Sequence, residues 1–295
     1  MPISAEVMAN VKAERIRRIA DLTNRKTRER AGRFLIEGPQ SVREAVLWHP
    51  DVVQDLYVEV SGDQPDSPFA NPTIAKIAGK ALQFGVYVHK ATRAVMDRIS
   101  SDAQGIAAVG DLHAMREALR YDDTRHDGDG EPFAAAFWQV RDPGNAGTVI
   151  RAADAAGCDA VVLVDECVDP FNPKVIRSTA GSLFHLPVIA MTTDAFLDWS
   201  HKQDMTVIAA DVYGTDSRSP ESLTDVLAER RDAKAAGASP VGEAILFGNE
   251  ARGLPAAILE QTDRIVSIPL YGKAESLNLG TSAAVMLMSL AMAGR

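Results

Sequence analysis

The residues of this sequence that can do chemistry lie in three short segments, each directly after an apolar run. The first segment, residues 140–151, reads VRDPGNAGTVIR and holds Asn145 and Arg151. Its Pro-Gly pair predicts a turn, and we expect Asn145 to be the N-cap of a helix that begins at Ala146. Gly147 would let a ligand or another part of the backbone come close. The same pattern also fits an ordinary strand-to-helix turn that leaves Arg151 on the surface.

The second and third segments also place polar side chains at the ends of apolar runs. Residues 245–255 read ILFGNEARGLP, with Glu250 between two glycines. A carboxylate there is well placed to meet a ligand, because parallel sheets bind ligands at the carboxyl ends of their strands. A turn with a solvated salt bridge is the simpler interpretation. Residues 268–283 bring Ser276 and Asn278 to the start of the last predicted helix, where capping is their simpler role.

A repeating pattern of apolar runs and helical segments must position these residues. The runs are nearly continuous in apolar residues, which predicts a parallel sheet covered by helices on both faces. The predicted strands are 134–140, 160–165, 186–190, 206–211, 244–248 and 264–269. Residues 279–293 predict a buried or interface helix, and residues 230–240 a surface excursion without chemistry.

The first part of the sequence also alternates helix-like and strand-like segments, which predicts a smaller layered α/β domain. The predicted strands are 34–38, 55–60, 86–89 and 106–109, and the predicted helices are 10–31, 39–48, 73–84 and 92–100. Residues 121–132, YDDTRHDGDGEP, have the composition of a linker. We therefore expect one domain at residues 1–120 and a second at residues 133–295.

Basic residues are concentrated at the start of the chain. The net charge of the 295 residues is -9, yet residues 1–50 hold ten Lys or Arg against six Asp or Glu. A basic end on an acidic body suggests a local anionic partner, although a solvated helix face gives the same pattern.

Several classes of function are disfavoured by what the sequence lacks. It has no G-x-G-x-x-G after a strand, no Walker A motif and no His or Cys cluster with metal-ligand spacing. These absences argue against a dinucleotide-dependent oxidoreductase, a nucleotide triphosphatase and a zinc hydrolase, and we expect no metal. Two cysteines and an N-terminus unlike a signal peptide make a cytoplasmic setting the default expectation. Residues 279–293 are shorter than the roughly 20 residues that a bilayer needs.

Taken together and in this order, the three segments resemble the SpoU (TrmH-type) RNA ribose methyltransferases of the SPOUT superfamily. The first motif of that family is Asn-x-Gly-x-x-x-Arg, the second is Gly-x-Glu-x-x-Gly, and the third is Ile-Pro followed by Ser-x-Asn. The matching residues are Asn145, Gly147 and Arg151, then Gly248, Glu250 and Gly253, then Ile268, Pro269, Ser276, Leu277 and Asn278. Residues 169–181 are also similar to the family, whereas Gly280 stands where the family often has Ser.

The resemblance implies a trefoil-knotted α/β methyltransferase domain with a parallel sheet, S-adenosylmethionine as cofactor and a ribose 2′-hydroxyl of RNA as acceptor. The cofactor-binding residues that it implies are Leu246, Gly248, Ile268 and Leu277. The catalytic residues that it implies are Arg151, Asn145, Glu250, Ser276 and Asn278. Because arginine stays protonated, we expect Arg151 to orient the hydroxyl and stabilise the developing alkoxide charge. Glu250 or an RNA phosphate would accept the proton, Asn145 would hold Arg151 or the ribose, and Ser276 and Asn278 would complete the hydrogen-bond network.

The first part of the chain resembles, more loosely, the ribosomal-protein-like RNA-binding domain that this family often carries. The residues expected to contact the RNA backbone are Arg25, Lys26, Arg28, Arg30 and Arg33. The resemblance also implies a homodimer formed through the knotted domains, and no membrane partner. The appended domain favours ribosomal RNA as substrate. The alternatives are tRNA, a self-protective resistance methylase and a non-catalytic RNA-binding assembly factor.

Overall fold

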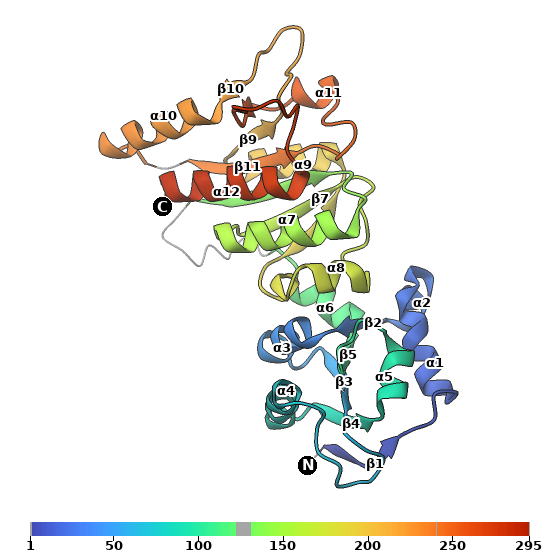
Figure 1. The fold of residues 1–295 in the computed structure, drawn as a ribbon. Coiled ribbons are helices and arrows are strands. Elements are labelled where there is room, and N and C mark those ends of the chain that lie inside the picture. The colour runs from blue at the N-terminus through green and yellow to red at the C-terminus, as the bar shows by residue number, and fades with distance from the viewer. Residues whose placement is uncertain (1, 122–130, 240, 295) are drawn as a thin grey trace. The chain divides into compact units, whose positions relative to one another are not determined.

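A computed structural model describes residues 2–121, 131–239 and 241–294 of the chain (Figure 1). By its internal contacts the chain divides into two compact units. The first comprises Met1–Leu119 and Asp169–His185, and the second Arg120–Val168 and Leu186–Arg295. The proposed linker, residues 121–132, lies mostly outside the described residues. The division into domains at 1–120 and 133–295 stays a prediction, to which the structure adds that residues 169–185 pack with the first unit.

The first unit is built on a mixed five-stranded sheet in the order β1-β4-β3-β5-β2. Its strands are β1 Ile3–Met8, β2 Arg33–Glu37, β3 Val53–Glu59, β4 Tyr87–Ala91 and β5 Ile106–Asp111. Its helices are α1 Glu14–Ala20, α2 Arg25–Ala31, α3 Pro39–Trp48, α4 Pro72–Gln83, α5 Arg93–Ile99, α6 Leu112–Ala118 and α8 Pro173–Ser178. The layered α/β prediction for this part of the chain is confirmed.

Two details of the first unit differ from the predictions. The single basic helix expected over 10–31 is two helices, because a 3-10 turn at Asp21–Thr23 precedes Asn24. The backbone of Asn24 is extended and its side chain accepts a hydrogen bond from the amide of Lys26, which starts α2 anew. Strand β1 was missed because it is a half-exposed edge strand without a clear apolar face.

The second unit contains a parallel seven-stranded sheet in the order β10-β12-β9-β11-β6-β7-β8. Its strands are β6 Phe133–Trp138, β7 Ala160–Val164, β8 Val188–Met191, β9 Met205–Ala210, β10 Glu221–Ser222, β11 Gly242–Phe247 and β12 Arg264–Ser267. Its helices are α7 Pro143–Ala156, α9 Thr193–Lys202, α10 Leu223–Ala235, α11 Ala256–Leu259 and α12 Leu279–Gly294. Every residue of β6, β7 and β11 is buried, as expected for the centre of a parallel sheet covered on both faces.

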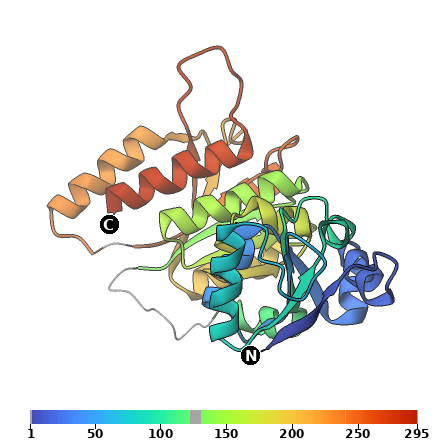
Figure 2. The ribbon, with the colours of Figure 1, turned by 60° about the horizontal axis from the view of Figure 1, so that its bottom comes forward.

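Helices α7 and α12 lie side by side on one face of this sheet (Figures 1 and 2). Residues of α9 and α11, among them Phe196 and Ile258, join the core on the other face. The predicted parallel sheet and final helix are therefore confirmed. The surface excursion expected from residue 230 is wrong in its first part, because α10 extends to Ala235 through good helix formers. Among the described residues, no helix is both long and apolar enough to cross a membrane.

The order of the strands indicates where a ligand is expected to bind. The chain runs from β6 to β7 and β8 on one side, and then returns to β9 and, later, β11 on the other side of β6. Strands β6 and β11 are therefore neighbours whose following loops leave in opposite directions, with Phe137 paired to Phe247. Open parallel sheets bind ligands at the carboxyl ends of such a strand pair. The trefoil knot that the resemblance implies stays a prediction.

Candidate active site

A tight turn at residues 248–253 directly follows β11. The amide of Asn249 donates to the carbonyl of Gly253 at 3.1 Å, and the amide of Gly253 donates back at 2.9 Å. Gly248 permits this closure, because a Cβ built there would lie 2.4 Å from the carbonyl carbon of Gly253. The turn leaves the side chain of Glu250 exposed at the edge of the sheet.

Three of the predicted catalytic residues, Asn145, Glu250 and Asn278, form one hydrogen-bonded chain. The amide nitrogen Nδ2 of Asn278 donates to Oδ1 of Asn145 at 3.1 Å, and Nδ2 of Asn145 donates to Oε1 of Glu250 at 3.2 Å. The polarity of this chain is fixed at its far end, where Oδ1 of Asn278 accepts the backbone amide of Gly280 at 2.8 Å. Both asparagines must therefore direct their NH₂ groups toward the carboxylate.

Asn145 is free to join this chain because it is not the cap of its helix. The predicted N-cap is wrong: α7 begins at Pro143, and the carboxylate of Asp142 caps it by accepting the amide of Asn145 at 2.8 Å. Asn145 thus lies in the first turn, with its side chain turned toward Glu250 and Asn278.

Close packing of α7 against α12 brings Asn145 and Asn278 within reach of each other. A Cβ built on Gly280 would lie 2.6 Å from Cγ2 of Thr148 and 3.2 Å from Oδ1 of Asn278. Thr148 itself is fixed by its hydroxyl, which donates to the carbonyl of Gly144 at 2.8 Å. The glycine that departs from the family pattern therefore makes room for Thr148 in this chain.

Arg151 and Ser276 are not part of this network. Both side chains are exposed, and neither makes a hydrogen bond or ion pair to another described residue. Arg151 lies six positions after Asn145 on α7, which is about 9 Å along the helix axis. Asn145 holds Glu250 rather than Arg151, so the expected contact between Asn145 and Arg151 is absent from this structure.

The predicted cofactor residues fall into two groups. Leu246 is wholly buried one residue before the end of β11, so it would meet a cofactor only through its backbone. Ile268 and Leu277 are partly buried and flank a loop after β12. The backbone amides of residues 268–277 donate no hydrogen bond to another described residue. Free backbone amides beside apolar side chains suit an adenosine group, so these residues fit the cofactor that the resemblance implies.

Two residues that the predictions gave no role, Gln139 and Asn249, complete the polar edge. Gln139 follows β6 in a left-handed conformation with φ 51°. Its carbonyl accepts Nδ2 of Asn249 at 2.8 Å, and its side-chain Oε1 accepts Nη2 of Arg252 at 2.7 Å. Asn249 stands inside the second motif and could have been suspected from it, whereas Gln139 carries no signal in the sequence.

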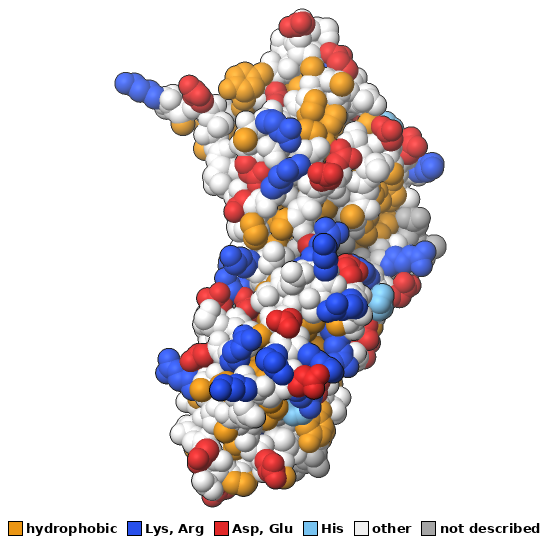
Figure 3. Space-filling model, turned by 90° about the vertical axis from the view of Figure 1, so that its right-hand side faces the viewer, with side chains coloured by type: hydrophobic (Ala, Val, Ile, Leu, Met, Phe, Trp, Pro, Cys, Tyr) orange, Lys and Arg blue, Asp and Glu red, His pale blue; other side chains and the backbone are white. Residues whose placement is uncertain are grey.

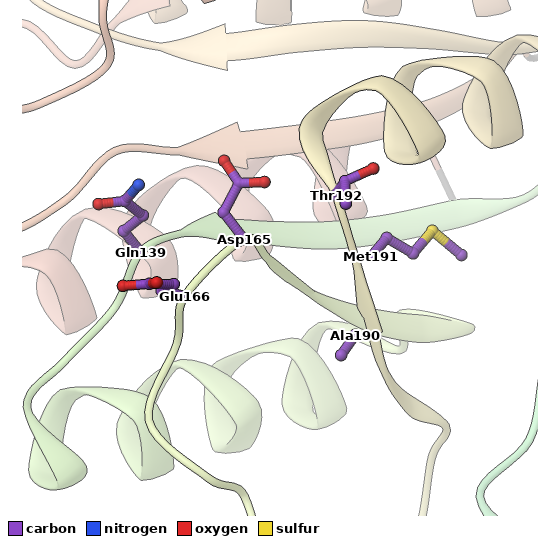
Figure 4. A pocket seen from close by; sticks show the side chains of 6 residues that line it. All are labelled: Gln139, Asp165, Glu166, Ala190, Met191 and Thr192. Carbon is purple, nitrogen blue, oxygen red and sulfur yellow. The ribbon is translucent and has the colours of Figure 1, made fainter.

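A surface hollow lies at the ends of β6, β7 and β8 and is lined by Gln139, Asp165, Glu166, Ala190, Met191 and Thr192 (Figure 4). Asp165 already has internal partners: it accepts hydrogen bonds from Nε1 of Trp138 and from the amide and hydroxyl of Thr193. These bonds hold β6, β7 and α9 together, which is a structural role. Among the described residues, no cluster of His, Cys, Asp and Glu side chains forms a metal site.

The predicted RNA contacts lie on α2 and β2 of the first unit. Lys and Arg side chains gather on this side of the unit (Figure 3). Arg25, Lys26, Arg30 and Arg33 are exposed. Arg28 is 2% exposed, and its guanidinium donates hydrogen bonds to the carbonyls of Leu22 and Thr23 and to the carboxylate of Asp169. Arg28 therefore cannot reach a phosphate, and its assignment as an RNA contact is wrong.

Comparison with known proteins identifies the family. Residues 132–288 match the model of the SpoU rRNA Methylase family, and residues 13–108 match the MRM3-like substrate binding domain. The 23S rRNA (guanosine(2553)-2′-O)-methyltransferase RlmP of Bacillus subtilis is 31% identical over 95% of this chain and 97% of its own length. The 23S rRNA (uridine(2479)-2′-O)-methyltransferase of Streptomyces viridochromogenes is 27% identical over 90% of this chain and 85% of its own length.

Solved structures agree with this relationship. The AdoMet-bound rRNA methyltransferase from Sinorhizobium meliloti is 26% identical and superposes with a TM-score of 0.72, covering 98% of this chain and 97% of that one. The chain therefore belongs to the SpoU rRNA Methylase family. It is an RNA methyltransferase with an N-terminal substrate-binding domain, and its methyl donor is S-adenosylmethionine.

Proposed function

We propose that this chain methylates a ribose 2′-hydroxyl in the RNA of the large ribosomal subunit. The relatives that cover nearly the whole chain are named as 23S rRNA 2′-O-methyltransferases, which supports both the acceptor atom and the RNA. The observation that carries the chemistry is the hydrogen-bonded chain from Asn278 through Asn145 to Glu250. These hydrogen bonds orient the Glu250 carboxylate at the carboxyl ends of the strands, where a ligand is expected.

Glu250 is proposed as the proton acceptor for the ribose hydroxyl. Its two oxygens accept N–H groups from Asn145 at 3.2 Å and from Asn249 at 3.3 Å, which fixes the plane of the carboxylate. Each carboxylate oxygen has two lone pairs, so one remains available for the incoming hydroxyl. Asn145 and Asn278 are positioning residues in this scheme, because they act through Glu250.

Arg151 is proposed to orient the ribose hydroxyl and to stabilise the alkoxide charge that develops as the proton leaves. A guanidinium has no acceptor atom and stays protonated, so it cannot be the base. Arg151 is exposed and makes no ion pair with a described residue, which leaves its donors available for RNA. Ser276 is exposed on the loop before α12 and would bind substrate or cofactor there.

The loop after β12 would hold the cofactor. S-adenosylmethionine supplies an electrophilic methyl group on a positively charged sulfur. Ile268 and Leu277 would pack against its adenosine, and the free backbone amides between them would meet its polar atoms. Gly248 keeps the neighbouring turn closed and would contact the cofactor through its backbone.

RNA binding and dimer formation complete the proposal. Arg25, Lys26, Arg30 and Arg33 would neutralise phosphates of the RNA. A second copy of the chain would cover the outer side of α12, where Val285 is 38% and Met292 is 72% exposed on an otherwise apolar helix. Sedimentation of the purified protein should then give twice the chain mass of 31.7 kDa, and a monomer would refute the dimer.

The test is transfer of a labelled methyl group from S-adenosylmethionine to ribosomal RNA that lacks its natural modifications. Label should enter one nucleotide and make the adjacent bond resistant to alkali. Arg151→Ala should lower the rate by about 10²–10³-fold, the scale for removing a donor that stabilises a developing oxyanion. Arg231→Ala is the matched control, because Arg231 is an exposed arginine on α10 with no assigned role. Label in tRNA alone would refute the ribosomal substrate, and no label in any RNA would refute the enzyme.

A further inference from the structure

Asn249 directly precedes the proposed proton acceptor, and both its backbone and its side chain are hydrogen-bonded. Only 9% of it is exposed, whereas the neighbouring Glu250 is exposed. Its backbone is locked to Gly253 by the two reciprocal hydrogen bonds of the turn. Neither the three family motifs nor the proposed mechanism assigns its side chain a role.

The side-chain amide of Asn249 can take only one orientation. Its Oδ1 accepts the backbone amide of Ala251 at 3.0 Å, so its Nδ2 must face the other way. There Nδ2 has two acceptors, the carbonyl of Gln139 at 2.8 Å and Oε2 of Glu250 at 3.3 Å. A buried NH₂ group with two hydrogens and two acceptors is fully satisfied.

The carbonyl that anchors Asn249 is itself held rigidly. Gln139 directly follows β6 in the left-handed region, which a residue with a side chain adopts only where its surroundings impose it. Its amide donates to the carbonyl of Val164 in the neighbouring strand at 3.0 Å. Its side chain accepts from Arg252, whose guanidinium also lies over the ring of Trp138 at 5.6 Å. The carbonyl of Gln139 is therefore a fixed point on the sheet.

We propose that Asn249 is a positioning residue for the Glu250 carboxylate. Its side-chain amide links that carboxylate to the carbonyl of Gln139, at the carboxyl end of β6. Asn145 on α7 donates to Oε1, and Asn249 in the turn after β11, anchored on the carbonyl of Gln139, donates to Oε2. Two donors on opposite oxygens leave the carboxylate one orientation, which a single donor would not. The inference rests on the proposed role of Glu250 and adds the element that sets its geometry.

The test is a double-mutant cycle on the full-length protein, read out as the steady-state kcat and KM of methyl transfer to ribosomal RNA. Asn249→Asp keeps the acceptor for Ala251 but sets oxygens against Gln139 and Glu250. We expect it to lower kcat by about tenfold or more, since small misplacements of a reacting group are costly. The KM for RNA and the Kd for S-adenosylmethionine should stay within about twofold, because neither binding depends on Glu250. Asn249→Ala is the second variant, in case the added charge disturbs folding.

The double-mutant cycle distinguishes a purely structural role of Asn249 from a role that acts through Glu250, because the two predict different kcat values for the double variant. If Asn249 acts through Glu250, adding Asn249→Asp to Glu250→Gln should not slow the reaction further. Asn71→Asp is the matched control, because Asn71 caps α4 in the first unit and Asp caps equally well. The inference about Asn249 would be overturned, without affecting the role of Glu250, by either of two results. One is a loss of kcat in the double variant equal to the product of the two single losses, and the other is a wild-type kcat in both Asn249 variants. A wild-type rate for Glu250→Gln would overturn the proposed role of Glu250, and the inference with it.

Discussion

At the scale of single residues, the site depends on the direction of side-chain amides as much as on their presence. Two separate chains of donors reach Glu250, one from Asn278 through Asn145 and one from Asn249. Each chain starts at a backbone amide, of Gly280 in the first and of Ala251 in the second. Because a backbone N–H cannot reverse its polarity, neither asparagine chain can turn an oxygen toward the carboxylate without losing a hydrogen bond.

The charge on Glu250 can be measured through a neighbouring thiol. Burial raises the pKa of Cys167 to about 11, backbone hydrogen bonds oppose that rise, and the negative charges of Asp165 and Glu250 add to it. Removing a nearby negative charge favours the thiolate, so Glu250→Gln should lower the pKa of Cys167. The pH dependence of iodoacetamide alkylation in a Cys158→Ser background should therefore shift to lower pH.

The size of this shift depends on where the charge sits. Glu166→Gln removes an exposed carboxylate one residue away that pairs with Arg141 and is not among the main contributions to the pKa of Cys167, so it should shift the alkylation profile less than Glu250→Gln does. Wild-type Cys167 should react slowly at pH 8, since the thiolate is the reactive form. An unchanged profile in Glu250→Gln would mean that Glu250 carries no charge near this thiol.

Sequence reasoning found the polar residues of the site but could not judge their burial. Asn145, Glu250 and Asn278 were predicted from three motifs, and the structure joins them. Arg28 was assigned wrongly, because residue type does not show which arginine is buried, and the sequence likewise did not show that the side chain of Leu246 faces the core. Gln139 was missed because its contribution is a backbone carbonyl placed by an unusual φ, which no residue pattern encodes.

At the scale of elements, the site is made by the contact between α7 and α12. Asn145 stands in the first turn of α7 and Asn278 directly precedes α12, so their hydrogen bond depends on how closely the two helices approach. Gly280 sets that approach, since it faces Cγ2 of Thr148 where a Cβ would lie only 2.6 Å away.

A methyl group at this contact should separate the two helices and weaken the site. Gly280→Ala should destabilise the fold by about 1–3 kcal/mol, as overpacking of a well-filled contact does. It should also lower the methyl-transfer rate, because Asn278 would draw away from Asn145. Urea unfolding and single-turnover kinetics measure the two effects.

The same contact offers a rescue. Thr148→Ser removes Cγ2 but keeps the hydroxyl that donates to Gly144. Combined with Gly280→Ala it should restore much of both the stability and the rate, whereas Thr148→Ser alone should change little. A double variant no better than Gly280→Ala would show that the methyl group acts elsewhere, for example on Asn278 Oδ1 at 3.2 Å.

The elements were predictable where one physical signal dominated. The fully buried strands β6, β7 and β11 follow from continuous apolar runs, and α3 was predicted with its observed bounds. Strand β1 was missed because its burial alternates only weakly at an edge. The break between α1 and α2 was missed because the basic composition continues through it, while one capping side chain, Asn24, decides the backbone.

At the scale of the whole molecule, one segment of the region that matches the SpoU rRNA Methylase family packs with the first unit. Residues 169–185 lie within the match to the SpoU rRNA Methylase family, yet they pack in the first unit. Phe171 packs edge-on against Phe34 at 5.1 Å between ring centroids. Arg177 pairs with the buried Glu37, and Ser41 donates to the carbonyl of Ile176. The first unit is therefore incomplete without residues supplied from between β7 and β8.

The most deeply buried ion pair between residues 169–185 and the rest of the first unit joins Arg28 and Asp169, whose side chains are 2% and 10% exposed and 2.5 Å apart. Asp169→Ala would leave the buried guanidinium without its counter-charge. Removing one partner of a buried pair typically costs about 3–5 kcal/mol, so urea unfolding of the full chain should show a large loss of stability. Arg28→Met together with Asp169→Ala should recover part of it, because an apolar pair leaves no charge buried.

This pair of variants separates a structural arginine from one that binds RNA. If Arg28 were a phosphate contact, Arg28→Met would weaken RNA binding and reduce its salt dependence, and Asp169→Ala would not. A structural Arg28 predicts the opposite pattern: the double variant keeps the salt dependence of the wild type, while exposed Arg25→Ala lowers it. The loss of stability in Asp169→Ala is expected because Arg28 is left without a partner. Recovery of stability in the double variant would therefore show that residues 169–185 contribute to the stability of the first unit through this pair. Equal destabilisation by the single and double variants would instead assign the loss to Asp169 alone, whose carboxylate also accepts the amide of Phe171 at 2.9 Å.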